Sequence, residues 1–137
     1  ILDSRILFIS DDILLKKFFY DCKILLSENG KFILNLVNLN KFKTQKVSKL
    51  PTRKSIRVSM FTELLSEKPN QHFINVKLET GNKKIVPVIS NQKISFLSPD
   101  LIKKYALEAG FKSINFYATY KKDDFTEDSD YMIVEIS

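Results

Sequence analysis

The stretch from residue 97 to residue 136 carries the clearest start and stop signals in the chain, and it limits the folds that the chain can adopt. Ser98 suits a helix N-cap, Pro99 fits the first helical position, and Asp100 places a negative charge in the first turn. Apolar residues recur at helical spacing until Gly110, a residue type that tolerates the positive φ often found just past a helix end. Residues 113–120 then alternate between polar and apolar side chains, which is typical of a strand. The stretch predicts a helix, a glycine turn, a strand, a long acidic loop at 121–130 and a last strand at 131–136.

The first 40 residues predict a strand, a helix and a second strand. The apolar run Ile6–Ile9 is typical of a short strand buried on both faces. Ser10 and Asp11 follow it and are suited to cap a helix, which the apolar spacing continues as far as Gly30. Residues 31–38 then form a second apolar run. A strand, a capped helix and a strand predict a right-handed crossover with parallel strands.

Residues 41–96 predict a basic loop and a β-hairpin inserted into a single domain. Residues 41–54 contain Pro51 and polar punctuation, which indicate a loop. Residues 56–65 fit a helix or a strand equally well. Two apolar runs, 73–78 and 85–89, flank the turn Thr80-Gly81-Asn82 and predict an antiparallel hairpin, with room for another short strand at 93–97.

Composition limits the class of protein. A chain of 137 residues with 44% hydrophobic content can bury one core. The single cysteine excludes a disulfide framework and favours a reducing compartment, for which the cytoplasm is the default. No apolar run approaches the roughly 20 residues of a membrane span, so no membrane is expected. The chain starts in mid-pattern at an isoleucine, which predicts a fragment or a processed product.

One segment accounts for the whole positive net charge of +6. Between Lys41 and Arg57 there are seven basic residues and no acid. Such a segment can grip phosphates, which makes a nucleic-acid-binding module one hypothesis. However, lysines outnumber arginines 19 to 3, which favours a general compositional bias, because lysine is the poorer residue for bidentate recognition.

Two stretches resemble class I S-adenosylmethionine-dependent methyltransferases. The stretch LSPDLIKKYALEAGFKSINFYATYKKDDFTEDSDYMIVEI resembles their C-terminal end, in which a helix leads through a junction like Ala109-Gly110-Phe111 to the sixth strand and an antiparallel seventh strand. The stretch DCKILLSENGKFILNLVN resembles the segment around their fifth strand, with Asn29-Gly30 where the family has paired glycines. The resemblance implies an α/β fold. It would be a partial Rossmann-like methyltransferase sheet of late parallel strands and an antiparallel last strand, with a hairpin or lid inserted at 41–96.

The candidate site residues follow the predicted parallel strands, because ligands of such sheets bind beyond the carboxyl ends of the strands. The resemblance implies that Ser10 and Asp11 approach the cofactor, S-adenosylmethionine; helix capping is the alternative for Asp11. Asn38, Asn40 and Tyr120 are predicted to bind the substrate. Turn formation for the asparagines, and core packing for the tyrosine, are the alternatives. No residue is assigned a catalytic role.

The cofactor-binding half of such a fold is missing from the sequence. It needs a Gly-rich turn after the first strand, and the three glycines here form no G-x-G. A metal site is also not expected, because there is one histidine and the acidic loop lacks the glycine of a calcium loop.

Three hypotheses follow. The first is the C-terminal portion of a methyltransferase that acts on a small molecule by in-line methyl transfer. The second is a non-catalytic, methyltransferase-like subunit, because an unpaired edge at Ile6–Ile9 would need a partner chain or a second copy to cover it. The third is the nucleic-acid-binding module that uses residues 41–57.

Overall fold

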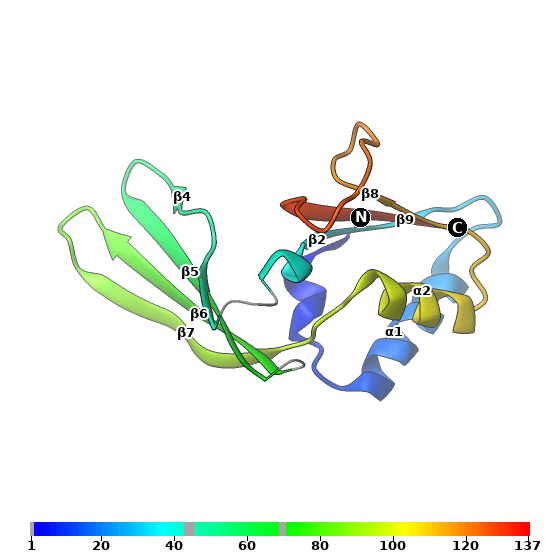
Figure 1. The fold of residues 1–137 in the computed structure, drawn as a ribbon, viewed down its shortest axis with the longest axis horizontal. Coiled ribbons are helices and arrows are strands. Elements are labelled where there is room, and N and C mark those ends of the chain that lie inside the picture. The colour runs from blue at the N-terminus through cyan, green and yellow to red at the C-terminus, as the bar shows by residue number, and fades with distance from the viewer. Residues whose placement is uncertain (1, 43–45, 69–70) are drawn as a thin grey trace. The chain divides into compact units, whose positions relative to one another are not determined.

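The structure is a computed structural model that describes residues 2–42, 46–68 and 71–137 (Figure 1). The chain divides into two compact units. Unit 1 consists of Ile1–Lys41 and Leu97–Ser137, and unit 2 consists of Phe42–Phe96, which interrupts unit 1 in the sequence. Neither α-helix in the described ranges is long and apolar enough to cross a membrane.

Unit 1 is a mixed sheet with two helices on one face and a loop on the other (Figure 1). The strand order is β1-β2-β9-β8, in which β1 and β2 are parallel and β9 is antiparallel to both β2 and β8. The α/β class and the antiparallel last strand are therefore confirmed. The strands are β1 (Leu2–Asp3), β2 (Phe32–Val37), β8 (Ile114–Tyr117) and β9 (Tyr131–Ile136), and the helices are α1 (Asp12–Leu25) and α2 (Pro99–Glu108).

The core of unit 1 lies between the sheet and the two helices. Alternate residues of β2 are buried and stand opposite alternate buried residues of β9 in the antiparallel register: Phe32 pairs with Ile136, Leu34 with Val134, and Leu36 with Met132. Phe19 of α1 is completely buried, with its ring 6.1 Å from that of Phe32 and 5.9 Å from that of Tyr105 on α2. Aromatic pairs at these separations stabilise a core beyond the area that they bury.

The predicted helix caps are present. Ser98 Oγ accepts a hydrogen bond from Leu101 N–H at 3.2 Å, and Asp11 Oδ1 accepts one from Leu14 N–H at 2.9 Å. Gly110 has a φ of +91°, as expected for a residue just past a helix end.

The predicted strand at Ile6–Ile9 is wrong. Residues Ser4–Phe8 form a 3-10 helix, η1, and the strand β1 lies upstream at Leu2–Asp3. Asp3 caps η1 by accepting a hydrogen bond from Arg5 N–H at 3.0 Å, which turns the chain away from the sheet. Ile6 and Leu7 are buried as consecutive residues on this helix. The predicted unpaired edge therefore does not lie at Ile6–Ile9; among the described strands of this sheet, β1 stands at that edge.

Unit 2 is an antiparallel sheet in the order β3-β5-β6-β7, with β4 also paired to β5. The predicted hairpin is present as β6 and β7, and residues 56–65 contribute to a strand, β5. The interpretation of residues 41–54 as a loop is wrong in part, because β3 and β4 form there by pairing with β5. The strands are β3 (Val47–Lys49), β4 (Arg53–Lys54), β5 (Val58–Lys68), β6 (Gln71–Thr80) and β7 (Ile85–Ile94); a short 3-10 helix, η2 (Leu39–Phe42), precedes them.

Candidate functional site at the carboxyl edge of unit 1

Three strands of unit 1 end at the same edge of the sheet. β1 ends at Asp3 and β2 at Val37, and β8 ends there too because both it and β2 are antiparallel to β9. We call this the carboxyl edge. The segments that follow the three strands are η1, η2 and residues 118–130, which we call the edge loop. Ligands of open α/β sheets bind at such an edge.

Ser4 joins the ends of the two parallel strands. Val37 N–H donates to Ser4 Oγ at 2.9 Å, and the Ser4 hydroxyl donates to the Asn35 carbonyl at 3.4 Å. Its neighbour Asp3 also binds Arg5 through the guanidinium Nε at 2.8 Å, and this carboxylate raises the pKa of Arg5. Asp3, the last residue of β1, and Ser4, which follows it, thus lie at the end of the first parallel strand, the place that the sequence interpretation gave to Ser10 and Asp11.

Asn38 holds the edge loop against the end of β2. Its side chain is completely buried. The amide Nδ2 donates to the carbonyls of Glu127 and Ser129 at 2.8 Å each, with a longer contact of 3.5 Å to the carbonyl of Thr126. Its backbone N–H donates to the carbonyl of Asp130 at 3.1 Å. The role that the structure shows for Asn38 is therefore to position the loop.

Asn40 completes this cluster, and its side-chain oxygen is a buried acceptor. Its backbone N–H and its Nδ2 both donate to Asn38 Oδ1, at 3.1 and 3.2 Å. This bonding fixes the orientation of the Asn40 amide, so its Oδ1 points the other way, where it is buried and has no hydrogen-bond partner among the residues that the structure describes. A buried acceptor without a partner costs free energy, which a donor on a bound molecule can recover.

The other predicted site residues take no part in the hydrogen bonds of this cluster that join described residues. Ser10 and Asp11 follow η1 rather than a strand, and the Asp11 carboxylate caps α1. The neighbouring Asp12 accepts a hydrogen bond from the Tyr105 hydroxyl. Tyr120 is 58% exposed in the turn where the edge loop begins. The structure thus brings Asn38 and Asn40 together at the carboxyl edge, and roles for Ser10 and Asp11 at the cofactor and for Tyr120 at the substrate remain predictions.

Sequence reasoning missed Asp3 and Ser4, although a signal for them was present. An Asp-Ser pair is as good a helix cap as the later Ser10-Asp11 pair, so cap signals flank the apolar run on both sides. A cap signal before the run permits a short helical turn there as well as a strand.

Ionic contacts anchor the edge loop further. Lys41 Nζ lies 2.6 Å from the carboxylate of Asp130, and Lys122 Nζ lies 3.2 Å from that of Glu135 on β9. Lys31 also reaches Glu135 at 2.9 Å, and the hydrogen bonds from Lys31 and Lys122 lower the pKa of Glu135. Within the described part of the chain, no three acidic, histidine or cysteine side chains lie close enough together to hold a metal ion.

Comparisons with known proteins identify the fold. No protein-family model and no curated protein matches the sequence. Among solved structures, the CcbJ methyltransferase from Streptomyces caelestis matches with a TM-score of 0.75 at 11% identity, over 98% of this chain and 54% of that one. An S-adenosylmethionine-dependent methyltransferase from Clostridium acetobutylicum ATCC 824 also matches with a TM-score of 0.75, at 13% identity over 98% and 55% of the two chains. The fold is that of part of an S-adenosylmethionine-dependent methyltransferase.

The methyltransferase fold recurs in a further solved structure. The glycopeptide N-methyltransferase MtfA matches with a TM-score of 0.51 at 16% identity, over 99% of this chain and 55% of that one. The chain therefore spans about half the length of the methyltransferases that it resembles.

The residues present do not form a complete cofactor site. S-adenosylmethionine sites in Rossmann-like sheets use a Gly-rich turn that lets the backbone approach the ligand. Gly30 precedes the amino end of β2, Gly110 precedes the amino end of β8, and Gly81 lies in unit 2. None of the three glycines lies at the carboxyl edge. At this edge, the described part of the chain instead places Asp3, Ser4 and the asparagine cluster.

Proposed function

We propose that this chain is the C-terminal portion of an S-adenosylmethionine-dependent methyltransferase that acts on a small molecule. The observation that carries the proposal is the sheet order β1-β2-β9-β8 with an antiparallel β9, together with the match of 98% of the chain to methyltransferase structures. In this proposal unit 2 is the lid over the substrate, and the Gly-rich half of the fold is supplied elsewhere. The single, half-buried cysteine fits a place in the cytoplasm.

The residues of this chain would form one wall of the site. Bound S-adenosylmethionine supplies the electrophilic methyl group, and the protein around it mainly has to position the reactants. Ser4 fixes the ends of β1 and β2 relative to each other, and Asn38 fixes the edge loop beside them. The free Oδ1 of Asn40 would then accept a hydrogen bond from a substrate hydroxyl or amine, and Tyr120 would contact the substrate from the start of the loop.

We also propose that another polypeptide segment covers the outer edge of β1 and the outer face of α1. β1 is paired only to β2 among the described strands, so its other edge is open. α1 exposes Ile13, Ile24 and Leu25 with exposed fractions of 76, 63 and 84%. Open strand edges and clustered exposed aliphatic side chains are usually covered in an assembled protein. The segment that brings the Gly-rich turn fits this surface, and a second copy of the chain is the alternative.

A calorimetric titration with S-adenosylhomocysteine, the demethylated cofactor, tests the proposal. It would use this chain alone and the longest polypeptide or complex in which the chain occurs in the cell. We expect no binding to the chain alone and micromolar binding to the larger form. Micromolar binding to the chain alone would contradict the inference that a cofactor site needs a Gly-rich turn from elsewhere. A lack of binding to both forms would refute the enzyme and favour the alternative, a non-catalytic methyltransferase-like subunit.

A further inference from the structure

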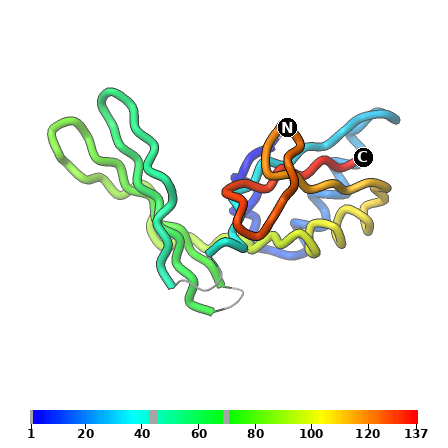
Figure 2. Tube along the Cα trace, turned by 45° about the horizontal axis from the view of Figure 1, so that its top comes forward, coloured from blue at the N-terminus to red at the C-terminus, as the bar shows by residue number. Residues whose placement is uncertain are grey.

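Two turns of unit 2 meet at one end of its sheet. The first turn, residues 55–57, joins β4 to β5, and the second, residues 81–84, joins β6 to β7. Val58 at the start of β5 pairs with Thr80 at the end of β6, so both turns emerge from the same end. A Cβ atom placed on Gly81 would lie 3.8 Å from the carbonyl oxygen of Arg57. The turns also lie side by side in both views (Figures 1 and 2). We call residues 53–58 and 80–88 the sheet tip.

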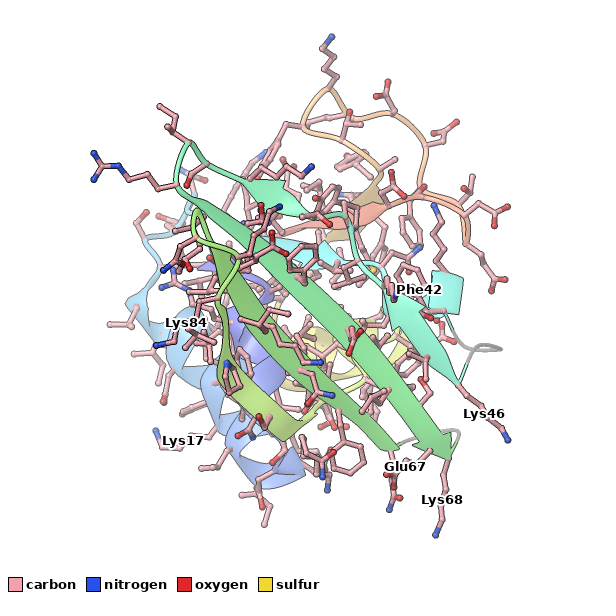
Figure 3. All side chains as sticks on the ribbon, turned by 90° about the vertical axis from the view of Figure 1, so that its left-hand side faces the viewer. Lys17, Phe42, Lys46, Glu67, Lys68 and Lys84 are labelled. Carbon is pink, nitrogen blue, oxygen red and sulfur yellow. The ribbon has the colours of Figure 1, made fainter. Side chains whose placement is uncertain are left out.

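The sheet tip is strongly positive. It carries five basic side chains, all exposed, and no acidic residue. The adjoining Glu79 pairs with Lys83 at 3.1 Å, and the other four cations form no ion pair with a described residue. At the opposite end of the sheet, charges of both signs occur, with Glu67 beside Lys68 (Figure 3). The five basic residues of the tip are Arg53, Lys54, Arg57, Lys83 and Lys84.

The same tip exposes aliphatic side chains among these cations. Ile56 stands at the first turn with an exposed fraction of 103%, so no part of its side chain is packed against the protein. Ile85 and Val88 beyond the second turn are 62 and 55% exposed. Aliphatic side chains clustered in water are unfavourable, and such clusters ringed by polar residues mark interaction sites.

From this combination we propose that the sheet tip binds the surface of an anionic lipid bilayer. Aliphatic side chains that enter the acyl boundary, surrounded by lysine and arginine at the headgroup level, are the features of interfacial membrane binding. Single-stranded nucleic acid fits less well, because its bases stack on aromatic side chains and the sheet tip contains none. The absence of an apolar span in the sequence argues against crossing a membrane, and it has no bearing on contact with its surface.

Co-sedimentation with vesicles tests this inference on the whole chain. We expect binding to vesicles of phosphatidylcholine mixed with phosphatidylglycerol, weak binding to phosphatidylcholine alone, and loss of binding in high salt. The substitution Ile56→Ser removes the aliphatic contact and leaves the charge unchanged, and it should weaken partitioning by about tenfold. The pair Arg53→Gln and Arg57→Gln should weaken it by about fivefold per charge.

Matched variants on unit 1 separate a local contact from general stickiness. Ile24→Ser removes an aliphatic side chain that is 63% exposed from α1, and Lys103→Gln with Lys104→Gln removes two exposed charges from α2. Both should leave partitioning unchanged. No binding to the mixed vesicles, or an equal loss in the control variants, would overturn the inference. Binding to a single-stranded oligonucleotide that Ile56→Ser leaves intact, without vesicle binding, would favour nucleic acid instead. Vesicle binding and binding of S-adenosylhomocysteine are separate measurements, so either proposal can fail without the other.

Discussion

Replacing Asn38 by alanine should lower the free energy of unfolding of unit 1 by about 2–4 kcal/mol. The variant loses the two 2.8 Å hydrogen bonds to the carbonyls of Glu127 and Ser129, and the acceptor of both Asn40 donors. Each such bond contributes about 1 kcal/mol, and a buried group left unpaired costs about 1–3 kcal/mol. The carbonyl groups of the edge loop can partly rotate toward solvent and bond to water. The expected loss therefore lies in the lower part of the range that these contributions sum to.

Urea unfolding followed by tyrosine fluorescence measures this change selectively. The chain has no tryptophan, and all five tyrosines lie in unit 1, so the signal reports the unfolding of unit 1 only. Asn115→Ala is the matched control, because Asn115 is exposed and the one bond its amide donates within the described part of the chain goes to the nearby Ser113 Oγ at 3.0 Å. The control should change stability by less than about 0.5 kcal/mol. The tyrosines are Tyr20, Tyr105, Tyr117, Tyr120 and Tyr131.

A second substitution at the same position adds a dependence on pH. Asn38→Asp keeps the shape of the side chain, but an ionised carboxylate cannot donate and would face the carbonyl oxygens of Glu127 and Ser129. Burial beside these oxygens should raise the folded-state pKa of the new carboxyl above its unfolded value of about 3.9. The destabilisation should thus be largest near neutral pH and should shrink as the pH falls through that raised pKa. Equal stability of Asn38→Ala and Asn115→Ala, or a pH-independent effect of Asn38→Asp, would refute the assigned role.

Three further predictions concern unit 1. Phe19→Ala should lower its free energy of unfolding by about 3–5 kcal/mol in the same urea assay, because the ring is completely buried; a loss below about 1 kcal/mol would show that the core closes around the gap. Burial, and then the charge of Asp21, raise the pKa of the Cys22 thiol. Alkylation of Cys22 by iodoacetamide should therefore reach its plateau at higher pH in the folded chain than in urea, and superimposed profiles would contradict this reasoning. Glu135→Gln should cost less than about 1 kcal/mol at neutral pH because its lysine partners are solvent-screened, and the cost should vanish as the pH falls through the lowered pKa of Glu135; a cost that persists in acid would assign it to packing instead.

The C-terminal elements could be predicted from sequence because their signals are local. The cap at Ser98 and the turn at Gly110 act within one helical turn, and the alternation around Phe116 needs only the neighbouring residues. The run Ile6–Ile9 carries no such information, since a short apolar run fits a buried strand and a buried helical turn equally well. The hydrogen bond from Val37 N–H to Ser4 Oγ helps to select the helical turn, and it joins residues 33 positions apart in the sequence.

Local sequence also failed to predict the strands within residues 41–54. Pro51 and the polar residues around it favoured a loop at residues 41–54. Val47 and Lys49 nevertheless lie in a strand because they pair with Leu65 and Glu63 on β5, so tertiary pairing overrides the local preference.

The asparagine cluster bears on how a divided methyltransferase fold would assemble. Among the described residues, the hydrogen bonds that hold the edge loop at Asn38 come from within unit 1, from segments that this chain itself provides. The loop is therefore already positioned before any partner segment binds. Association does not have to supply the conformational entropy cost of ordering it. The position of Asn38 in the sequence suggested that it lies at this edge, but its partners are 89 and 91 residues away and only the fold reveals them. In the proposed function, a segment that brings the Gly-rich turn would meet a preformed wall, and Asn40 Oδ1, a buried side-chain acceptor with no partner among the described residues, would be available to the ligand.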